Sequence, residues 1–181
     1  MSESGFPYVG ARRVTRSRFL TLERGYYRTP DGGWMVRELI RHPGCVVVIP
    51  WDGRTIRMIR QFRAAAGTTL LELPAGKLDV PGEPPEVTAR REAIEEIGMR
   101  PGRLRLLHRT FLSPGFTDEV CHIYLAEDLE PVAVDPQGAE ERHAEIVTMT
   151  LEEVTAELGR GSIIDAKTLI GCYALLGARE P

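Results

Sequence analysis

Short apolar and β-branched runs separated by turn residues occupy the first quarter of the chain. Two such runs, residues 18–24 and 34–40, flank the string Thr29-Pro30-Asp31-Gly32-Gly33. Proline presets φ and glycine accepts positive φ, so this string is typical of a tight turn. The pattern predicts an antiparallel hairpin, and residues 9–41 as a whole read as short strands broken by turns.

A second group of strands follows, and its first member is apolar throughout. The run Cys45–Pro50 has no polar position, which predicts a central strand buried on both faces. Asp52-Gly53 turns the chain into a paired strand at Thr55–Gln61. Further strands are expected at 70–73 (ended by Pro74-Ala75-Gly76), 104–111, 120–126 and 145–149.

Three helices are expected among these strands. The first covers residues 84–97, where two prolines stand at its start and Gly98 ends it as a C′ residue. The second begins after Thr150, which forms a capping box with Glu153, and runs to about Leu158.

The last helix begins after Asp165, an N-cap residue, and runs through Leu176. Residues 127–142 are acidic and read as a loop. Strands and helices do not alternate strictly, so the order favours an α+β sandwich over a doubly wound parallel sheet.

Composition narrows the class of protein. The chain has 181 residues, 43% of them hydrophobic and 27% charged, as in an ordinary folded domain. The net charge of −3 speaks against nucleic-acid binding, which usually needs a basic surface. The apolar runs are too short to cross a bilayer, and the first residues do not resemble a secretory signal.

The three cysteines, Cys45, Cys121 and Cys172, are scattered without the spacing of metal ligands. They read as small core residues, and a reducing compartment such as the cytoplasm is expected. We therefore expect neither a membrane nor a nucleic acid as a partner.

The candidate chemistry lies in three glutamates of the first predicted helix. Glu92, Glu95 and Glu96 stand at i, i+3 and i+4 and share one helical face. Like charges at this spacing repel, and a divalent cation would turn the repulsion into attraction. Arg91 is able to orient a glutamate by bidentate pairing. The simpler interpretation is a solvated acidic face, and it stays open on these residues alone.

The surrounding spacing resembles the Nudix box, G-x5-E-x7-R-E-U-x-E-E-x-G-U, in which U is apolar. One residue is inserted between Gly76 and Glu83, which affects only the loop, and Ala93 is small for its apolar position. The strand order on both sides extends the resemblance over residues 44–176. The residues that match in register are Glu83, Arg91, Glu92, Glu95, Glu96, Gly98 and Met99.

The resemblance implies an α/β/α sandwich around a mixed β-sheet and Mg²⁺-dependent hydrolysis of a nucleoside diphosphate joined to another group, with Mn²⁺ as a substitute. A metal ion neutralises the pyrophosphate, lowers the pKa of bound water and holds the attack in line. The metal ligands implied are Ala75, Glu92, Glu95 and Glu96, with Glu83 in support and Arg91 and Glu95 assisting catalysis.

Segments outside the box resemble the ADP-ribose pyrophosphatase branch of the family. Substrate-binding roles are implied for Arg63, for Glu72 and for the segment Ser113-Pro114-Gly115-Phe116. The predicted reaction is cleavage of ADP-ribose to AMP and ribose 5-phosphate. GDP-mannose, ADP-glucose or a related nucleotide sugar remains the alternative substrate, and a non-catalytic ADP-ribose sensor is a further alternative. Each segment also has a simpler interpretation, as a turn or a surface strand.

The branch usually takes its general base from an acidic loop before the last strand. Glu141 is the first candidate here, Glu140 the second, and Glu145 adjoins the strand; a disordered acidic loop is the simpler interpretation. Residues 1–43 resemble the antiparallel sheet through which this branch forms homodimers, often by exchange between subunits. Residues 44–181 are the expected hydrolase domain.

Overall fold

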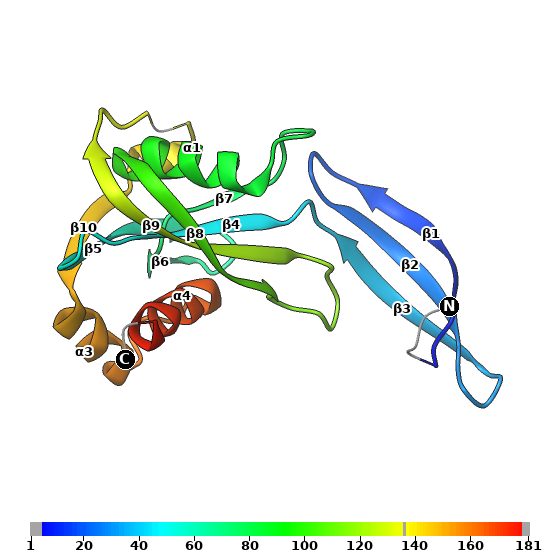
Figure 1. Cartoon of the computed structure of the whole chain (residues 1–181). Coiled ribbons are helices and arrows are strands. Elements are labelled where there is room, and N and C mark those ends of the chain that lie inside the picture. Colours follow the sequence, from blue (N-terminus) through cyan, green and yellow to red (C-terminus); the bar gives the residue numbers. More distant parts are fainter. Residues whose placement is uncertain (1–4, 136, 179–181) are drawn as a thin grey trace. The chain divides into compact units, whose positions relative to one another are not determined.

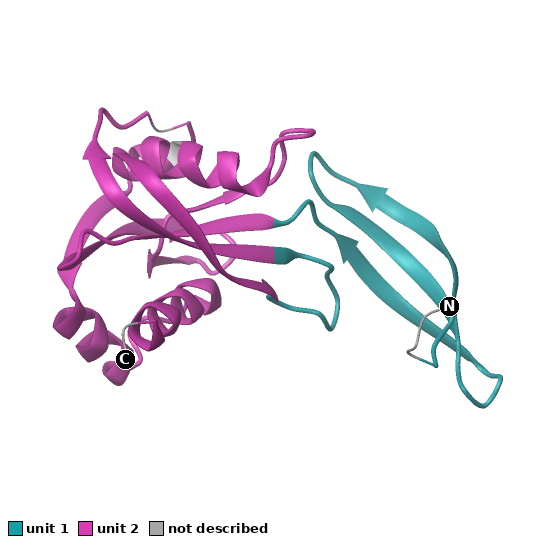
Figure 2. Ribbon diagram, viewed as in Figure 1, with its two compact units in different colours: residues 1–44, 111–120 teal, residues 45–110, 121–181 magenta. Residues whose placement is uncertain are grey.

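The computed structural model describes residues 5–135 and 137–178, apart from the side chains of residues 139 and 140. The chain forms two compact units, shown in Figure 2. Unit 1 comprises residues 1–44 and 111–120, and unit 2 comprises residues 45–110 and 121–181. Each unit has its own sheet structure.

Unit 1 contains a three-stranded antiparallel sheet in the order β1-β2-β3, formed by β1 (Tyr8–Arg16), β2 (Thr21–Arg28) and β3 (Trp34–Arg41). The turn between β2 and β3 forms as predicted, with Gly32 N–H donating to the Thr29 carbonyl at 2.9 Å. Gly32 has φ +86°, a conformation that favours glycine. The predicted hairpin is confirmed.

This small sheet has almost no interior. Among its described residues only Gly25 and Gly44 are buried, so unit 1 buries no side chain fully. Nine of its large apolar side chains are instead 40–57% exposed; they are Phe6, Tyr8, Val9, Val14, Phe19, Trp34, Val36, Phe111 and Phe116.

Unit 2 is built on a mixed four-stranded sheet in the order β7-β4-β9-β8. Its strands are β4 (Cys45–Pro50), β7 (Ala75–Lys77), β8 (Met99–Phe111) and β9 (Val120–Pro131). The strand β4 pairs antiparallel with β7 and parallel with β9. All six residues of β4 are buried, as the continuous apolar run predicted.

A second, antiparallel sheet of unit 2 has the order β10-β5-β6. It consists of β5 (Thr55–Arg63), β6 (Thr68–Glu72) and β10 (Glu145–Thr150). The sequence pattern predicted that the strand at 70–73 ends at Pro74, and it did not predict β7. The chain re-enters a sheet there because Val48 N–H donates to the Pro74 carbonyl at 2.9 Å and seats the segment beside β4.

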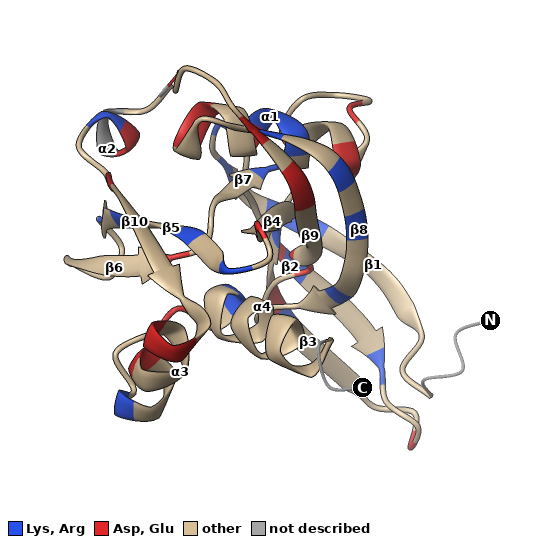
Figure 3. Ribbon diagram, turned by 60° about the vertical axis from the view of Figure 1, so that its left-hand side comes forward, with Lys and Arg blue, Asp and Glu red and all other residues tan. Residues whose placement is uncertain are grey.

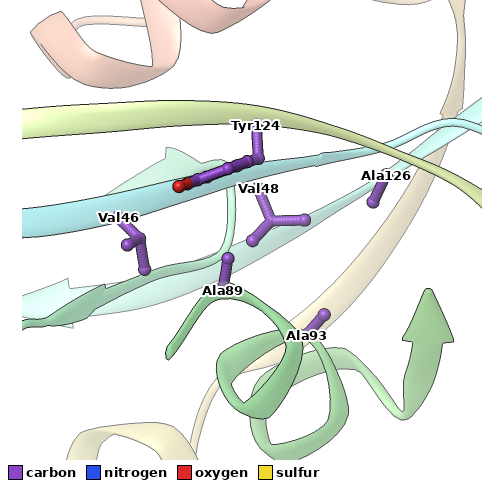
Figure 4. Packing of buried hydrophobic residues seen from close by; sticks show 6 residues of the cluster. All are labelled: Val46, Val48, Ala89, Ala93, Tyr124 and Ala126. Atoms are coloured by element: carbon purple, nitrogen blue, oxygen red, sulfur yellow. The ribbon is translucent and has the colours of Figure 1, made fainter. Parts of the chain in front are cut away.

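The longer helices are α1 (Pro85–Ile97), α3 (Leu151–Arg160) and α4 (Ala166–Gly177). Figure 1 shows α1 on one face of the sheet that contains β4 and α4 on the opposite face, which gives the expected α/β/α sandwich. Figure 4 shows the first interface, where Ala89 and Ala93 of α1 pack with Val46 and Val48 of β4. Small residues on the helix let it lie close to the sheet.

The caps of these helices agree with the sequence. Gly98 ends α1 with φ +61°, and Thr150 forms both bonds of the capping box at the start of α3. The acidic stretch before β10 differs from the loop expected there: β9 continues to Pro131, and α2 (Ala139–Arg142) forms one helical turn.

Candidate active site

The acidic face of α1 is organised by one arginine. Arg91 Nη1 lies 2.9 Å from Glu92 Oε1 and 2.9 Å from Glu95 Oε2, and Nη2 lies 3.3 Å from Glu83 Oε2. Figure 3 shows this mixture of acidic and basic residues on α1. The structure therefore brings together four of the predicted residues in one hydrogen-bonded group.

The segment Ala75-Gly76 lies directly against the remaining carboxylates. Ala75 N–H donates to Glu96 Oε2 at 2.9 Å. A Cβ atom built on Gly76 would lie 2.0 Å from Glu92 Cδ, so the Glu92 carboxylate packs on the glycine Cα. Glycine is needed here by close approach, which gives a physical reason for the first residue of the box.

Glu92 and Glu96 are difficult to ionise in this environment. Burial, with the charges of Glu95 and Glu141, raises the pKa of Glu92 to about 7 in spite of Arg91. Burial, with the charges of Glu92 and Glu141, raises the pKa of Glu96 to about 8 in spite of the Ala75 N–H bond. A buried and a partly buried carboxylate that repel each other are a costly arrangement for a merely structural site.

Glu83 has a different environment, at the start of α1. Its Oε2 accepts a 2.6 Å hydrogen bond from Thr88 Oγ1 as well as the contact from Arg91. The Thr88 bond is the main reason that the pKa of Glu83 is lowered. Glu83 therefore contacts the first turn of the helix and Arg91 in this structure, and its supporting role in metal binding stays a prediction.

The oxygen atoms gathered at this site are of the kind that bind a divalent cation. Carboxylate and carbonyl oxygens are the ligands of such ions, and positive charge would relieve the repulsion that raises both pKa values. Glu92, Glu96 and the Ala75 carbonyl are the groups that would hold it. Within the described residues, no three His, Cys, Asp or Glu side chains converge as a metal-binding group. In this structure Arg91 bonds oxygens of Glu92 and Glu95.

Arg63 and Glu72, both predicted to bind substrate, are paired with each other. The guanidinium donates from Nε to Glu72 Oε1 at 2.7 Å and from Nη2 to Oε2 at 2.6 Å. The Glu72 side chain is 0% exposed, whereas the Arg63 side chain is 39% exposed. Glu72 thus faces the interior and Arg63 is the partner that reaches solvent.

A third residue, Lys167, joins the Arg63–Glu72 pair and was not predicted from the sequence. Lys167 Nζ lies 2.6 Å from Glu72 Oε2 and 2.8 Å from Asp165 Oδ1. Burial opposes the ionisation of Glu72, but Arg63 and Lys167 outweigh it and hold the pKa of Glu72 below its usual value. Residues 72 and 167 lie too far apart in the sequence for any local pattern to connect them.

A second residue for which the sequence predicted no role is Gln61, in the strand β5. Its side chain is 3% exposed, and its Nε2 atom has no hydrogen-bond partner among the described residues. It shares a face of β5 with Arg63, two residues further along. A buried amide without a partner is costly, so it is a candidate for contact with a ligand.

Glu141 lies in α2, where its Oε2 accepts from the backbone N–H groups of Gln137 and Gly138 at 2.7 and 3.0 Å. Its charge acts on both Glu92 and Glu96, so the structure places it near the carboxylates of α1. Glu140 precedes it in α2, but its side chain is outside the part that the structure describes.

The segment Ser113–Phe116 belongs to unit 1, whereas the box belongs to unit 2. It forms a turn in which Phe116 N–H donates to the Ser113 carbonyl at 3.2 Å, and the Phe116 carbonyl accepts from Ile40 N–H at 2.7 Å. Its predicted role in substrate binding stays a prediction.

A hollow of about 680 Å³ elsewhere in unit 2 lies between β8 and α4. Its lining is mainly apolar, with Leu106, Ile170 and Tyr173 among the residues. It contains none of the box residues, so the chemistry described above belongs to the α1 face and not to this hollow.

Comparisons with known proteins agree with this geometry. A family model described as the NUDIX domain matches residues 41–169. The chain is 35% identical over 181 residues to an ADP-ribose pyrophosphatase of Mycobacterium tuberculosis, covering 97% of this chain and 85% of that protein. It is 39% identical over 140 residues to an ADP-ribose pyrophosphatase of Bacillus subtilis, covering 77% and 75%.

The fold has a close structural counterpart. The crystal structure of an ADP compounds hydrolase superposes with a TM-score of 0.84 at 21% identity, covering 98% of this chain and 96% of that one. At this level of identity the likeness bears on the fold, and it supports the sandwich described above.

Proposed function

The chain belongs to the Nudix family and is a Nudix hydrolase, and on that premise we propose that it cleaves the pyrophosphate bond of ADP-ribose to AMP and ribose 5-phosphate with Mg²⁺. The observation that carries the proposal is the pair of carboxylates against Ala75-Gly76, the buried Glu92 and the partly buried Glu96. The names of the two relatives support ADP-ribose as the substrate.

Each group of the site has a task in this reaction. When bound, Mg²⁺ neutralises the pyrophosphate and activates water for in-line attack. Glu92, Glu96 and the Ala75 carbonyl would hold the ion, and Arg91 keeps Glu92 and Glu95 in fixed positions. The exposed side of Arg63 meets an anionic part of the substrate, because Glu72 fixes its guanidinium plane by two parallel bonds.

We assign the general base to Glu141, since its charge already acts on Glu92 and Glu96. Glu141→Gln keeps an oxygen for the N–H groups of Gln137 and Gly138, so α2 should persist. Loss of the base should lower kcat by ~10² to 10⁴-fold. Glu140→Gln is the matched comparison. If it has the larger effect, the base is Glu140, the second candidate.

The homodimer expected from the sequence is part of the proposal. Unit 1 leaves nine large apolar side chains at least 40% exposed and buries no side chain fully among its described residues. A surface of this kind is typical of an interaction site, and a second copy of the chain in two-fold symmetry is the simplest occupant.

We also keep the cytoplasm as the proposed location. Cys45, Cys121 and Cys172 are all buried and none forms a disulfide. Among the described residues, none of the helices combines the length and the apolar character that crossing a membrane requires.

The test is product analysis with a panel of ADP-ribose, GDP-mannose and ADP-glucose, each with Mg²⁺ and with a chelator. Metal-dependent release of AMP from ADP-ribose, well above turnover of the other two, is the expected result. Preferred cleavage of another nucleotide sugar would keep the chemistry and reject the substrate. Tight ADP-ribose binding with no cleavage of any compound would favour the sensor.

A further inference from the structure

We propose that Lys167 and Thr168, in the first turn of α4, are positioning residues that hold the segment Glu72–Gly76 against the carboxylates of α1. The inference deepens the proposed function and rests on it for the roles of Arg63 and Ala75. It concerns a helix on the opposite face of the sheet from the box (Figure 1). Neither residue was singled out by the sequence.

Thr168 holds the backbone of this segment. Its Oγ1 accepts a 2.9 Å hydrogen bond from Leu73 N–H, and it donates in turn to Asp165 Oδ2 at 2.6 Å. Thr168 is 0% exposed and Leu73 is 0% exposed, so water does not replace this contact. A buried N–H group that loses its acceptor has to move or remain unpaired, and either outcome disturbs the segment.

The side chain of Leu73 is held by the same helix. A Cβ atom built on Gly171 would lie 2.4 Å from Leu73 Cδ1, so α4 approaches this leucine as closely as a glycine permits. Thr168 and Gly171 are three residues apart and therefore lie on one face of α4. The helix thus contacts Leu73 through both its backbone and its side chain.

Lys167 holds the neighbouring residue, Glu72. Its ammonium group bridges Glu72 Oε2 and Asp165 Oδ1, and its side chain is only 13% exposed. Glu72 in turn takes both parallel bonds of Arg63. Two cations and two carboxylates therefore form one balanced group, in which Lys167 fixes the carboxylate that orients Arg63.

The other end of the segment is held by contacts from β4 and α1. The Pro74 carbonyl accepts a hydrogen bond from Val48 N–H of β4. Ala75 N–H donates to the Glu96 carboxylate, and the Cα of Gly76 packs against the Glu92 carboxylate. Each residue from 72 to 76 has a separate anchor, and the first two anchors come from α4. The position of the Ala75 carbonyl relative to Glu96 therefore depends on α4 as well as on α1.

The test of Thr168 compares Thr168→Val, which removes the acceptor, with Thr168→Ser, which retains it. Thr155→Val on α3 removes an exposed hydroxyl that bonds the Leu151 carbonyl, and serves as the matched control. The readouts are amide hydrogen exchange of the peptide that contains Leu73–Gly76, Mn²⁺ affinity by electron paramagnetic resonance without substrate, and kcat at a temperature where each variant is folded.

Thr168→Val should speed exchange in this peptide and lower both Mn²⁺ affinity and kcat, on the order of 10-fold to 100-fold, since small displacements at a reacting centre are costly. Thr168→Ser should restore all three, and Thr155→Val should change none. A Thr168→Val protein that melts earlier but keeps wild-type Mn²⁺ affinity and kcat would overturn the proposal, because α4 would then be a structural support only.

Lys167→Met tests the second contact and remains informative if Thr168→Val does not fold. It should raise KM for ADP-ribose about tenfold through Arg63, with little change in kcat, and Lys167→Arg should restore KM. Unchanged KM and kcat in Lys167→Met would overturn the role of Lys167. Mn²⁺ affinity and hydrogen exchange need no substrate, so they still test the positioning role if the wild-type protein does not cleave ADP-ribose.

Discussion

The two units of this chain treat their apolar and charged residues in opposite ways. Unit 2 buries one entire strand, β4, in which Val46–Ile49 are 0% exposed, and it also buries the charged Glu72. Unit 1 buries only two glycines among its described residues. Unit 2 therefore has a core of its own, whereas a three-stranded sheet without a fully buried side chain among its described residues is marginal by itself.

The polar contacts differ in the same way. In unit 1 the Arg24–Glu38 pair at 3.4 Å lies at the surface, and even the His42–Glu119 pair keeps side chains that are 12% and 23% exposed. In unit 2 the carboxylates of Glu72, Glu92 and Glu96 are held in low-exposure networks. Surface pairs contribute little to stability, whereas buried ionisable groups point to function. The difference supports the two proposals made above, that the chemistry belongs to unit 2 and that unit 1 forms the dimer interface.

The largest expected effect is confined to unit 2. Glu96→Gln should lower kcat by several orders of magnitude, because it removes charge from the proposed metal site. The amide oxygen still accepts from Ala75 N–H, so the melting temperature and the oligomeric state should be retained. Steady-state kinetics with thermal melting check this, and wild-type turnover would remove Glu96 from the metal site.

The next effect is confined to unit 1. Val36→Lys places a charge on a side chain that is 43% exposed in the single chain, so each chain should still fold. If this sheet forms the dimer, its dissociation constant should rise at least about tenfold, because burying an unpaired charge is costly. Sedimentation velocity measures the change.

The matched control for unit 1 is Ile146→Lys, which changes a 40% exposed apolar residue of unit 2. It should leave the dissociation constant unchanged. An equal effect of the two substitutions, or a wild-type chain that is monomeric at micromolar concentration, would contradict the assignment of assembly to unit 1.

A smaller effect is expected in the pH dependence of stability. Glu92 and Glu96 have pKa values of about 7 and about 8 in the folded protein and 4.5 as the reference value. The folded state therefore binds these two protons more tightly than the unfolded state does. Their contribution to the free energy of unfolding is fully present below about pH 4.5 and is lost as the pH rises through 7 and 8.

The metal-free protein should accordingly melt at a lower temperature at about pH 8.5 than at about pH 5.5, and Mg²⁺ should restore stability at the higher pH. Thermal melting with a chelator and with Mg²⁺ measures both effects. The double variant E92Q/E96Q should show a flatter profile. A metal-free melting temperature that rises over this interval would contradict the raised pKa values.

The smallest effect concerns the unpaired amide of Gln61. Gln61→Met removes a buried donor without a partner at nearly constant volume, so it should stabilise the free protein by up to about 1 kcal/mol. If the amide contacts substrate, KM should rise at the same time. Urea denaturation and steady-state kinetics measure the two quantities. Destabilisation would instead show that the amide is satisfied in the free protein.

Local sequence determined much of this protein. The turn at Thr29–Gly33, the strand Cys45–Pro50 and the capping box at Thr150 follow from φ preferences, from apolar runs and from contacts between near neighbours. The spacing of Glu92, Glu95 and Glu96 likewise placed them together on one helix, because helical period is a local property.

The tertiary structure alone decided how these elements became a site. It placed Glu92 on Gly76, gave α4 a bond to Leu73 through Thr168, and added Lys167 to the Arg63–Glu72 pair. It also formed β7 beside β4, where the pattern indicated only the end of a strand. These contacts join residues up to 95 positions apart, so they depend on how the chain packs and have no local pattern to predict them.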